Sequence, residues 1–304
     1  MKYKKKLPRW VWIPAGVIFL FLFLFYGPFK SFRYMWINTA MYSSRHQFLA
    51  RIFYTENYIN KVLAQNELTG RRTDDLALAN NWDDEVEIAG IRGNHYRGFI
   101  IKINDPRRLI FSQADSEGGH LLEYLIDKHS GIGGINATGY AYPRRRGIPW
   151  GITIVDGQVV SNITREEPYT MGGFTADFKL VVGNFTEEEI MAQQYVWAFE
   201  FGPILIVNGE KTEISPFYGG LAPRTAIGQT EEGHILLVAI DGRQLNSIGA
   251  TFQDLQTILH ANGAVNAINL DGGSSTTIVY QGILVNNPAD GDAERLLPNA
   301  IIFK

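Results

Sequence analysis

The stretch AVNAINLDGGSSTTIVYQGILVN, Ala264 to Asn286, decides the fold of this chain. Its first seven residues carry no charge and are mostly apolar, which predicts a buried strand. Its last part sets a Gln-Gly pair between two apolar runs, which predicts a β-hairpin. Asp271 and a loop of two glycines and four hydroxyl residues therefore lie between a buried strand and a hairpin.

This loop has the composition of a binding site. Functional groups of α/β-type scaffolds gather where strands end, which favours a functional role for Asp271. Gly272 and Gly273 permit positive φ angles and let a ligand approach the backbone closely. Ser274 begins the run of hydroxyls, and successive exposed N–H groups in such a loop form an anion-binding nest. The competing interpretation is a tight Asp-Gly turn with a serine-rich exit, since such turns are common.

Strand and helix signals alternate along the rest of the chain. Strands are predicted for EIAGI, YRGFIIKI, RLIFS and HILLVAI, and GITIV-DG-QVVSN predicts a second hairpin. A short helical pattern starts at His120. Thr186 with Glu189, and Thr251 with Asp254, have the spacing of capping boxes and predict two further helices. We therefore predict an α+β fold with mixed, strand-rich sheets flanked by helices.

Two parts of the chain resemble each other. Gly134-Ile135-Asn136 follows a helix and small residues and precedes a loop and a strand–turn–strand unit. Ala267-Ile268-Asn269 has the same surroundings. The match is short, so it is either a repeat of two related halves or a coincidence. If it is a repeat, we expect the loops that carry Asn136 and Asp271 to meet at one site.

The N-terminal segment has the features of a membrane anchor. An uncharged run extends from Trp10 to Tyr26, close to the roughly 20 residues that span a bilayer as a helix. Four lysines and Arg9 precede it, which predicts a cytoplasmic N-terminus. No small-x-small cleavage site follows, so we prefer a retained anchor to a cleaved secretory signal. We expect a single-pass protein of the cell membrane, with one N-terminal transmembrane helix and its C-terminal domain extracellular.

We divide the chain into three parts. Residues 1–30 form the basic flank and the transmembrane anchor. Residues 31–85 form a helical stalk and a polar linker, because apolar residues recur at helical spacing between Ser43 and Leu68. Residues 86–304 form the main domain.

Composition excludes several classes of site and partner. The chain has 304 residues, a net charge of −3 and no long basic run beyond the membrane flank, so we expect no nucleic-acid partner. It contains no cysteine, which excludes cysteine nucleophiles, cysteine zinc sites and disulfides, and fits a bacterial envelope protein. The six histidines show no metal-ligand spacing, so we expect no metal and no cofactor.

Two arginines are candidate phosphate ligands. Arg224 lies between a proline-containing loop and a strand, and Arg295 follows Glu294 in a turn-rich segment. Guanidinium groups match phosphate oxygens in a bidentate manner. The alternative for each is a surface or structural ion pair.

Other polar residues carry weaker signals. Glu200 lies in the apolar run AFEFGPILI, where it is either a general acid with a raised pKa or a residue on an exposed strand face. Asp241 opens an Asp-Gly turn and is interpreted as structural. Arg144 to Arg146 face either an anionic polymer or solvent. The alternation of Asp290, Asp292 and Glu294 fails the calcium-loop pattern and is interpreted as a solvated turn.

Eight motifs occur in an order that resembles the phosphodiester glycosidase domain. They are GGIN (Gly133 to Asn136), GITIVDGQVV, FGPILIVNG, PRTAIG, VAIDGR, NLDGGSSTTIVYQG, VNNP and the pair Glu294-Arg295. The resemblance covers about Val86 to Lys304. Where this family commonly has NAGFF, the chain has Asn136-Ala137-Thr138-Gly139-Tyr140, which leaves the sugar-facing contacts open.

The resemblance implies hydrolysis of the bond between a sugar's anomeric carbon and a phosphodiester oxygen. It implies a site built from Asn136, Arg224 and Asp271, with the Gly272-Gly273-Ser274 loop, Glu294 and Arg295 as substrate-binding residues. Asp271 is then an acid/base group or a nucleophile, Asn136 orients the sugar, and the arginines hold phosphate.

The expected partner is a sugar-phosphate glycopolymer or glycoconjugate of a cell wall or exopolysaccharide. Two alternatives remain open at this stage. One is an envelope protein that binds anionic glycopolymers without catalysis. The other is a phosphodiesterase that cleaves the phosphorus–oxygen bond.

Overall fold

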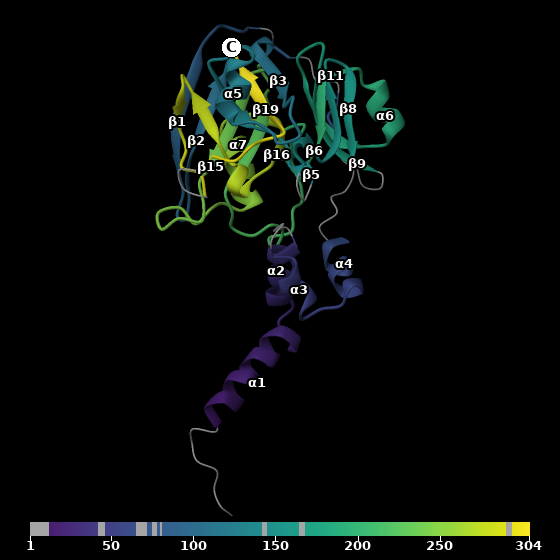
Figure 1. Ribbon diagram of the computed structural model, residues 1–304, viewed down its shortest axis with the longest axis vertical. Helices are drawn as coiled ribbons and strands as arrows, with labels where there is room; N and C mark the ends of the chain where they lie inside the picture. The colour runs from purple at the N-terminus through teal and green to yellow at the C-terminus, as the bar shows by residue number, and fades with distance from the viewer. Residues whose placement is uncertain are drawn as a thin grey trace, which may run out of the picture. The chain divides into compact units, whose positions relative to one another are not determined.

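The computed structural model describes residues 12–41, 46–64, 72–74, 78–79, 81–141, 145–163, 168–289 and 294–304 (Figure 1). Two compact units make up the chain. One unit comprises the helices of the first 67 residues with Ser215–Gly220, and the other comprises Leu68–Ile214 with Leu221–Lys304. The second unit contains all the strands that the structure describes.

The helical unit contains α1 (Trp12–Tyr26), α2 (Lys30–Met41), α3 (Phe48–Arg51) and α4 (Glu56–Ala64). Among the described residues, no single helix is long and apolar enough to cross a membrane. Gly16–Tyr26 and Lys30–Met41 meet that requirement only as a pair, and they are bent by 82° at the break between them. Pro28 lies in this break, where its ring cannot continue a helix. The expected single transmembrane helix is therefore not clearly shown within the described part of the chain.

Within the described residues, the apolar pattern between Ser43 and Leu68 forms two short helices, α3 and α4. Ile59 and Val62 of α4 are buried and pack with Ile37 and Ala40 of α2. The apolar residues of the stalk thus build a small core of their own.

The larger unit is built around a seven-stranded sheet, with strand order β1-β2-β15-β14-β16-β12-β13. Its strands are β1 (Val86–Arg92), β2 (Arg97–Ile103), β12 (Ile204–Val207), β13 (Glu210–Lys211), β14 (Arg224–Thr230), β15 (Ile235–Ile240) and β16 (Ala264–Leu270). β14, β15 and β16 are buried over almost their whole length. The apolar run before Asp271 is therefore a central strand, as predicted.

Two five-stranded sheets and a two-stranded one complete the unit. The first has the order β10-β9-β11-β7-β8 and the second the order β18-β17-β4-β19-β3, while β5 pairs with β6. Their bounds are β3 (Leu109–Gln113), β4 (Gly133–Asn136), β5 (Tyr140–Ala141), β6 (Arg145–Pro149), β7 (Gly151–Val155), β8 (Gln158–Ile163), β9 (Tyr169–Thr175), β10 (Leu180–Phe185), β11 (Tyr195–Glu200), β17 (Ile278–Tyr280), β18 (Ile283–Leu284) and β19 (Asn299–Phe303). Every pairing among the described strands is antiparallel.

Three helices of this unit follow the sequence signals. They are α5 (Leu122–Asp127), α6 (Glu187–Ala192) and α7 (Phe252–Ala261). Both predicted capping boxes form, Thr186 with Glu189 and Thr251 with Asp254. Figure 1 shows α6 beside the sheet that contains β8, β9 and β11. The predicted α+β class with strand-rich sheets and flanking helices is confirmed.

One hydrophobic core joins the three large sheets. It includes Ile227 and Ile268 of the seven-stranded sheet, Ile135 and Ile301 around β4, and Phe199 of β11, all with 3% exposure or less. Burial of such a side chain contributes about 1.5–3 kcal/mol. The ends of β4 and β16 are therefore fixed relative to each other by shared packing.

The two similar sequence segments occupy different positions in the fold. β4 lies in a five-stranded sheet and β16 in the seven-stranded sheet. The hairpin β7–β8 that comes after β4 is in another sheet, whereas β17 of the hairpin after β16 pairs with β4 itself. The similarity in sequence therefore does not extend to topology. The loops after β4 and β16 do meet, since Asp271 is hydrogen-bonded to Asn136 and Ala137.

Candidate active site

Asp271 stands at the end of β16, and its backbone N–H donates to the carbonyl of Ala137 at 2.8 Å. Its carboxyl group is next to Gly139, because a Cβ built on Gly139 would lie 3.9 Å from Oδ1 of Asp271 and 3.4 Å from the ring of Phe201. The residue keeps partial exposure. The carboxyl group of Asp271 thus faces the loop that follows β4.

Burial raises the pKa of the Asp271 carboxyl above its usual value. The nearby hydroxyl of Ser275, the charge of Arg295 and the N–H of Gly272 oppose this effect. A carboxyl group with a raised pKa retains its proton to higher pH, which suits a general acid. The environment of Asp271 therefore favours proton transfer over a purely structural turn.

Asn136 ends β4 and is completely buried. Its Nδ2 donates to the carbonyl of Asp271 at 2.6 Å. Its Oδ1 accepts from the hydroxyl of Thr225 at 3.0 Å and from the N–H of Thr277 at 3.1 Å. The side chain ties β4 to β14 and to both sides of the glycine loop, so it positions Asp271. A direct contact with sugar stays a prediction.

Arg224 begins β14 and is 7% exposed. Its guanidinium carbon lies 3.9 Å from the centre of the Phe252 ring, and its Nε donates to the carbonyl of Ala250 at 3.0 Å. Its backbone is beside the glycine loop, since a Cβ on Gly272 would lie 3.5 Å from the Cα of Arg224. Arg224 is thus next to the loop, with its guanidinium packed among protein groups.

Arg295 is brought to the site by Tyr140. Its guanidinium carbon is 4.9 Å from the centre of the Tyr140 ring, and its Nη2 donates to the Tyr140 hydroxyl. The segment that carries Arg295 is anchored by two hydrogen bonds between Leu297 and His120, at 2.8 and 3.1 Å. The charge of Arg295 lowers the pKa of the Asp271 carboxyl, against the effect of burial, and a shared role of the two residues in the site stays a prediction.

Glu294 precedes Arg295 and is half-buried. Burial, with a smaller contribution from the charge of Glu123, raises the pKa of Glu294. Its Oε2 is buried and has no hydrogen-bond partner in the structure. Glu294 therefore has a free acceptor beside the arginine, and its role in binding substrate stays a prediction.

The glycine loop differs from the predicted nest. The N–H of Gly273 donates to the carbonyl of Pro223 at 2.9 Å, and those of Ser275 and Thr276 donate to carbonyls within the loop at 3.2 and 3.3 Å. For these three N–H groups the prediction of an anion-binding nest is wrong, because their partners are already protein carbonyls. An anion at this loop needs side-chain donors.

Sequence reasoning missed Arg243, which follows the Asp-Gly pair after β15. Its Nη1 donates to the hydroxyl of Ser274 at 3.1 Å. The signal was present in VAIDGR, a cation placed just beyond a buried strand. Asp241 in the same motif is structural, as predicted, since it accepts from the N–H of Asn287 at 2.9 Å and from Nδ2 of Asn286 at 3.2 Å. Burial raises the pKa of Asp241.

Of the remaining candidates, the structure describes the side chain of Glu200 only. Glu200 is half-buried at the end of β11, where its Oε2 accepts from the N–H of Ile152 at 3.1 Å. Arg144, Asp290 and Asp292, and the side chains of Arg145 and Arg146, lie outside the described residues. In the part of the chain that the structure describes, no three acidic or histidine side chains are grouped as metal ligands.

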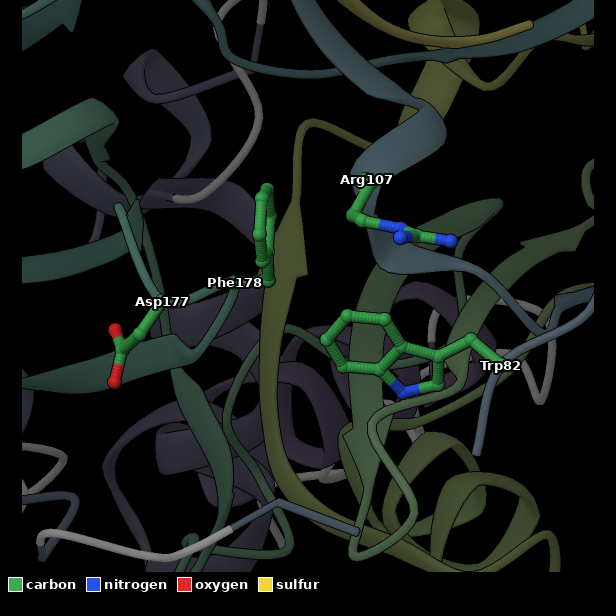
Figure 2. Close-up of a pocket in the computed structure, with 4 residues that line it drawn as sticks. All are labelled: Trp82, Arg107, Asp177 and Phe178. Atoms are coloured by element: carbon green, nitrogen blue, oxygen red, sulfur yellow. The ribbon is translucent and has the colours of Figure 1, made fainter. Parts of the chain in front are cut away.

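A cavity of about 480 Å³ lies elsewhere on the unit, lined by Trp82, Arg107, Asp177 and Phe178 (Figure 2). Trp82 is fixed by its Nε1, which donates to the carbonyl of Glu232 at 2.8 Å. The guanidinium of Arg107 lies 5.4 Å over its ring and Phe178 meets it edge-on at 5.8 Å. The indole of Trp82 is thus already in contact with other residues of the protein.

This cavity is remote from Asp271. Glu232 lies in the turn before Ile235, the first residue of β15, whereas Asp241 and Arg243 follow the opposite end of that strand. At about 3.4 Å per residue the two ends of β15 are roughly 17 Å apart. The cavity is therefore separate from the candidate active site.

Comparisons with known proteins agree with this geometry. The phosphodiester glycosidase family model matches residues 129–304. Human N-acetylglucosamine-1-phosphodiester alpha-N-acetylglucosaminidase is 33% identical over 136 residues, which are 39% of this chain and 26% of the human protein. The SPbeta prophage-derived uncharacterized protein YomE of Bacillus subtilis is 41% identical over 69 residues, 23% of this chain and 11% of that protein. The chain thus spans about a quarter of the length of the human relative.

A solved structure supports the fold. The catalytic domain of zebrafish N-acetylglucosamine-1-phosphodiester alpha-N-acetylglucosaminidase, auto-inhibited by its pro-peptide, aligns with a TM-score of 0.63 at 21% identity. The alignment covers 82% of this chain and 93% of that chain. The family match alone takes in more than half of the chain and every residue from Asn136 to Arg295 that forms the site. This chain belongs to the phosphodiester glycosidase family.

Proposed function

We propose that this protein hydrolyses the bond between the anomeric carbon of a sugar and a phosphodiester oxygen. One observation supports the proposal: Asn136 holds the backbone of Asp271, a partly exposed residue whose buried carboxyl group has a raised pKa and feels the charge of Arg295. Family membership supports the reaction class, and the names of the human and zebrafish relatives describe this bond.

The reaction replaces one bond at carbon with another. The bond from the anomeric carbon to the phosphodiester oxygen breaks, its electron pair goes to that oxygen, and the oxygen of water bonds to the carbon. The products are the free sugar and a phosphomonoester, with one proton released. Asp271 transfers protons in this sequence, to the leaving oxygen or from the water. The leaving phosphate is a weak base, so cationic groups that neutralise its charge lower the barrier further.

The test is sugar release by the full-length protein in detergent. The substrate is methyl N-acetylglucosamine-α-1-phosphate, and Asp271→Asn removes the proton-transferring group. We expect the rate to fall by at least about 100-fold. Asp156→Asn is the matched control, because Asp156 is an exposed turn residue between β7 and β8. A wild-type rate in Asp271→Asn refutes the assignment.

The same experiment separates the alternatives. If the reaction is run in oxygen-18 water, label in the sugar indicates cleavage at carbon, and label in the phosphate indicates cleavage at phosphorus. Saturable binding of an anionic glycopolymer without any turnover indicates a non-catalytic binding protein.

We also propose a location and a natural substrate class. The uncharged run to Tyr26 and its basic flank support a membrane-anchored protein with its larger unit outside the cell. A sugar-phosphate polymer of the cell wall or an exopolysaccharide is then the accessible substrate. Protease digestion of intact cells tests this topology, since only an extracellular unit is cleaved.

A further inference from the structure

Arg243 has an unusual position for an exposed arginine. Besides its bond to Ser274, its guanidinium lies against Gly273, because a Cβ built there would be 3.2 Å from Nη2 and 3.8 Å from Cζ. Among the described residues it forms no ion pair with a carboxylate. Of its five N–H donors, one meets Ser274, so the others are available to a ligand.

The backbone around Arg243 is held in place. Arg243 has a φ of +60°, which non-glycine residues rarely adopt and which here needs support from its surroundings. Its N–H donates to the carbonyl of Ile248 at 3.0 Å, and the hydroxyl of Ser247 donates to the carbonyl of Asp241 at 2.7 Å. The carboxylate of Asp241 fixes the other side of this turn to Asn287. The cation is therefore presented by a preorganised loop.

The other groups at the loop are less suited to hold an anion. Arg224 is buried on Phe252, and three loop N–H groups already donate to carbonyls. Arg295 already donates to the Tyr140 hydroxyl, and its charge acts on Asp271. Arg243 lies against Gly273 and donates to the hydroxyl of Ser274. The loop thus has a carboxyl group at one end and an exposed guanidinium at the other.

We infer that Arg243 is the residue that holds the substrate's phosphodiester and makes the site prefer it to an uncharged glycoside. This inference rests on the proposed function. A sugar at Asp271 places its anomeric phosphate over Gly273, where the lack of a side chain leaves room beside the guanidinium. Arg243 donates two N–H groups to the phosphate oxygens and stabilises the negative charge that grows as the carbon–oxygen bond breaks.

The first arm of the test measures phosphate binding without turnover. Thermal unfolding of the full-length protein in detergent is followed with inorganic phosphate added at constant ionic strength. We expect phosphate to raise the Tm of the wild type and of Arg92→Met, but not that of Arg243→Met. Arg92 is the matched control, as an exposed arginine at the end of the edge strand β1. Without phosphate, Arg243→Met should unfold like the wild type, since the side chain is exposed.

The second arm measures specificity. We expect Arg243→Met to lower kcat/KM for the phosphodiester by about 100-fold and to lower kcat/KM for the neutral para-nitrophenyl glycoside of the same sugar much less, because that substrate has no phosphate for Arg243 to bind. Arg243→Lys keeps the charge without the forked donors, so its loss should be smaller. Equal losses on both substrates overturn the inference, because they indicate a role in shaping the loop.

The two arms keep this inference apart from the proposed function. If the wild type cleaves neither substrate, the proposed function fails while the phosphate arm still decides the role of Arg243. The inference is overturned if phosphate does not stabilise the wild type or if it stabilises Arg243→Met equally.

Discussion

The side chain of Asn136, at the end of β4, is hydrogen-bonded to the backbone of Asp271, which follows β16 in a different sheet. Nδ2 of Asn136 donates to the carbonyl of Asp271, and the N–H of Asp271 donates to the carbonyl of Ala137. These two hydrogen bonds join the end of β4 to the end of β16, although the two strands are far apart in the chain. The position of the carboxyl group depends on an amide that is itself completely buried.

Replacement of Asn136 by alanine should therefore reduce both stability and activity. It leaves the hydroxyl of Thr225 and the N–H of Thr277 without their shared acceptor inside the protein. We expect a loss of about 2–4 kcal/mol in the free energy of unfolding, measured in urea, with a fall in kcat. Asn262→Ala is the control, since that residue is exposed after α7. An unchanged free energy in Asn136→Ala contradicts the account.

The raised pKa of Asp271 makes a prediction about stability and pH. The folded state binds the proton more tightly than the unfolded state, so stability falls as pH rises from the ordinary value of 3.8 through the raised pKa. Asp271→Asn removes this loss of stability at higher pH, because an amide cannot ionise. We expect the variant to have a higher Tm than the wild type above this window, and the difference to disappear below it.

Thermal unfolding at several pH values checks this. If the difference in Tm between Asp271→Asn and the wild type does not depend on pH, ionisation of Asp271 does not cause that difference.

Gly272→Ala should be destabilising for a purely steric reason. A Cβ at this position would lie 2.5 Å from the carbonyl oxygen of Pro223, which is backbone and cannot rotate away. The φ of −105° is itself acceptable to alanine. We expect a loss of about 1–3 kcal/mol, measured by chemical denaturation. Gly90→Ala is the control because no atom lies within 4 Å of its Cβ position, and a loss of the same size there would contradict the steric explanation.

Tyr140→Phe separates the two contacts that hold Arg295. The variant keeps the ring under the guanidinium and loses the hydroxyl that accepts from Nη2. We expect kcat/KM for the phosphodiester to fall by about 10-fold, and Tyr140→Ala to lose more. Tyr280→Phe serves as the control, since its hydroxyl interacts with Gln281 away from the arginines. Equal kcat/KM values in Tyr140→Phe and the wild type would show that the hydroxyl of Tyr140 does not help Arg295 to act on the phosphodiester.

Local features of this fold were predictable because their causes lie within a few residues. The capping boxes of Thr186 and Thr251 depend on a partner three residues away, and the hairpin at Asp156 depends on its own two-residue turn. The strand before Asp271 was predictable from its apolar run. These signals do not depend on where the rest of the chain lies.

The parts that sequence could not supply depend on long-range packing. Whether Arg224 faces substrate or Phe252 is decided by α7, which reaches it through the tertiary fold. The predicted nest does not form at Gly273, because the carbonyl of Pro223, the residue before β14, accepts from its N–H. Arg243 was overlooked because nothing in the motif itself shows that its side chain turns towards Ser274.

The position of β19 bears on when the protein becomes active. This strand lies between β4 and β3, so it closes the sheet that carries Asn136. Until β19 arrives, β4 has an open edge, and its pairing must wait for a segment made much later in synthesis. A chain that is still being synthesised therefore lacks the finished sheet around Asn136 until its last strand has been made.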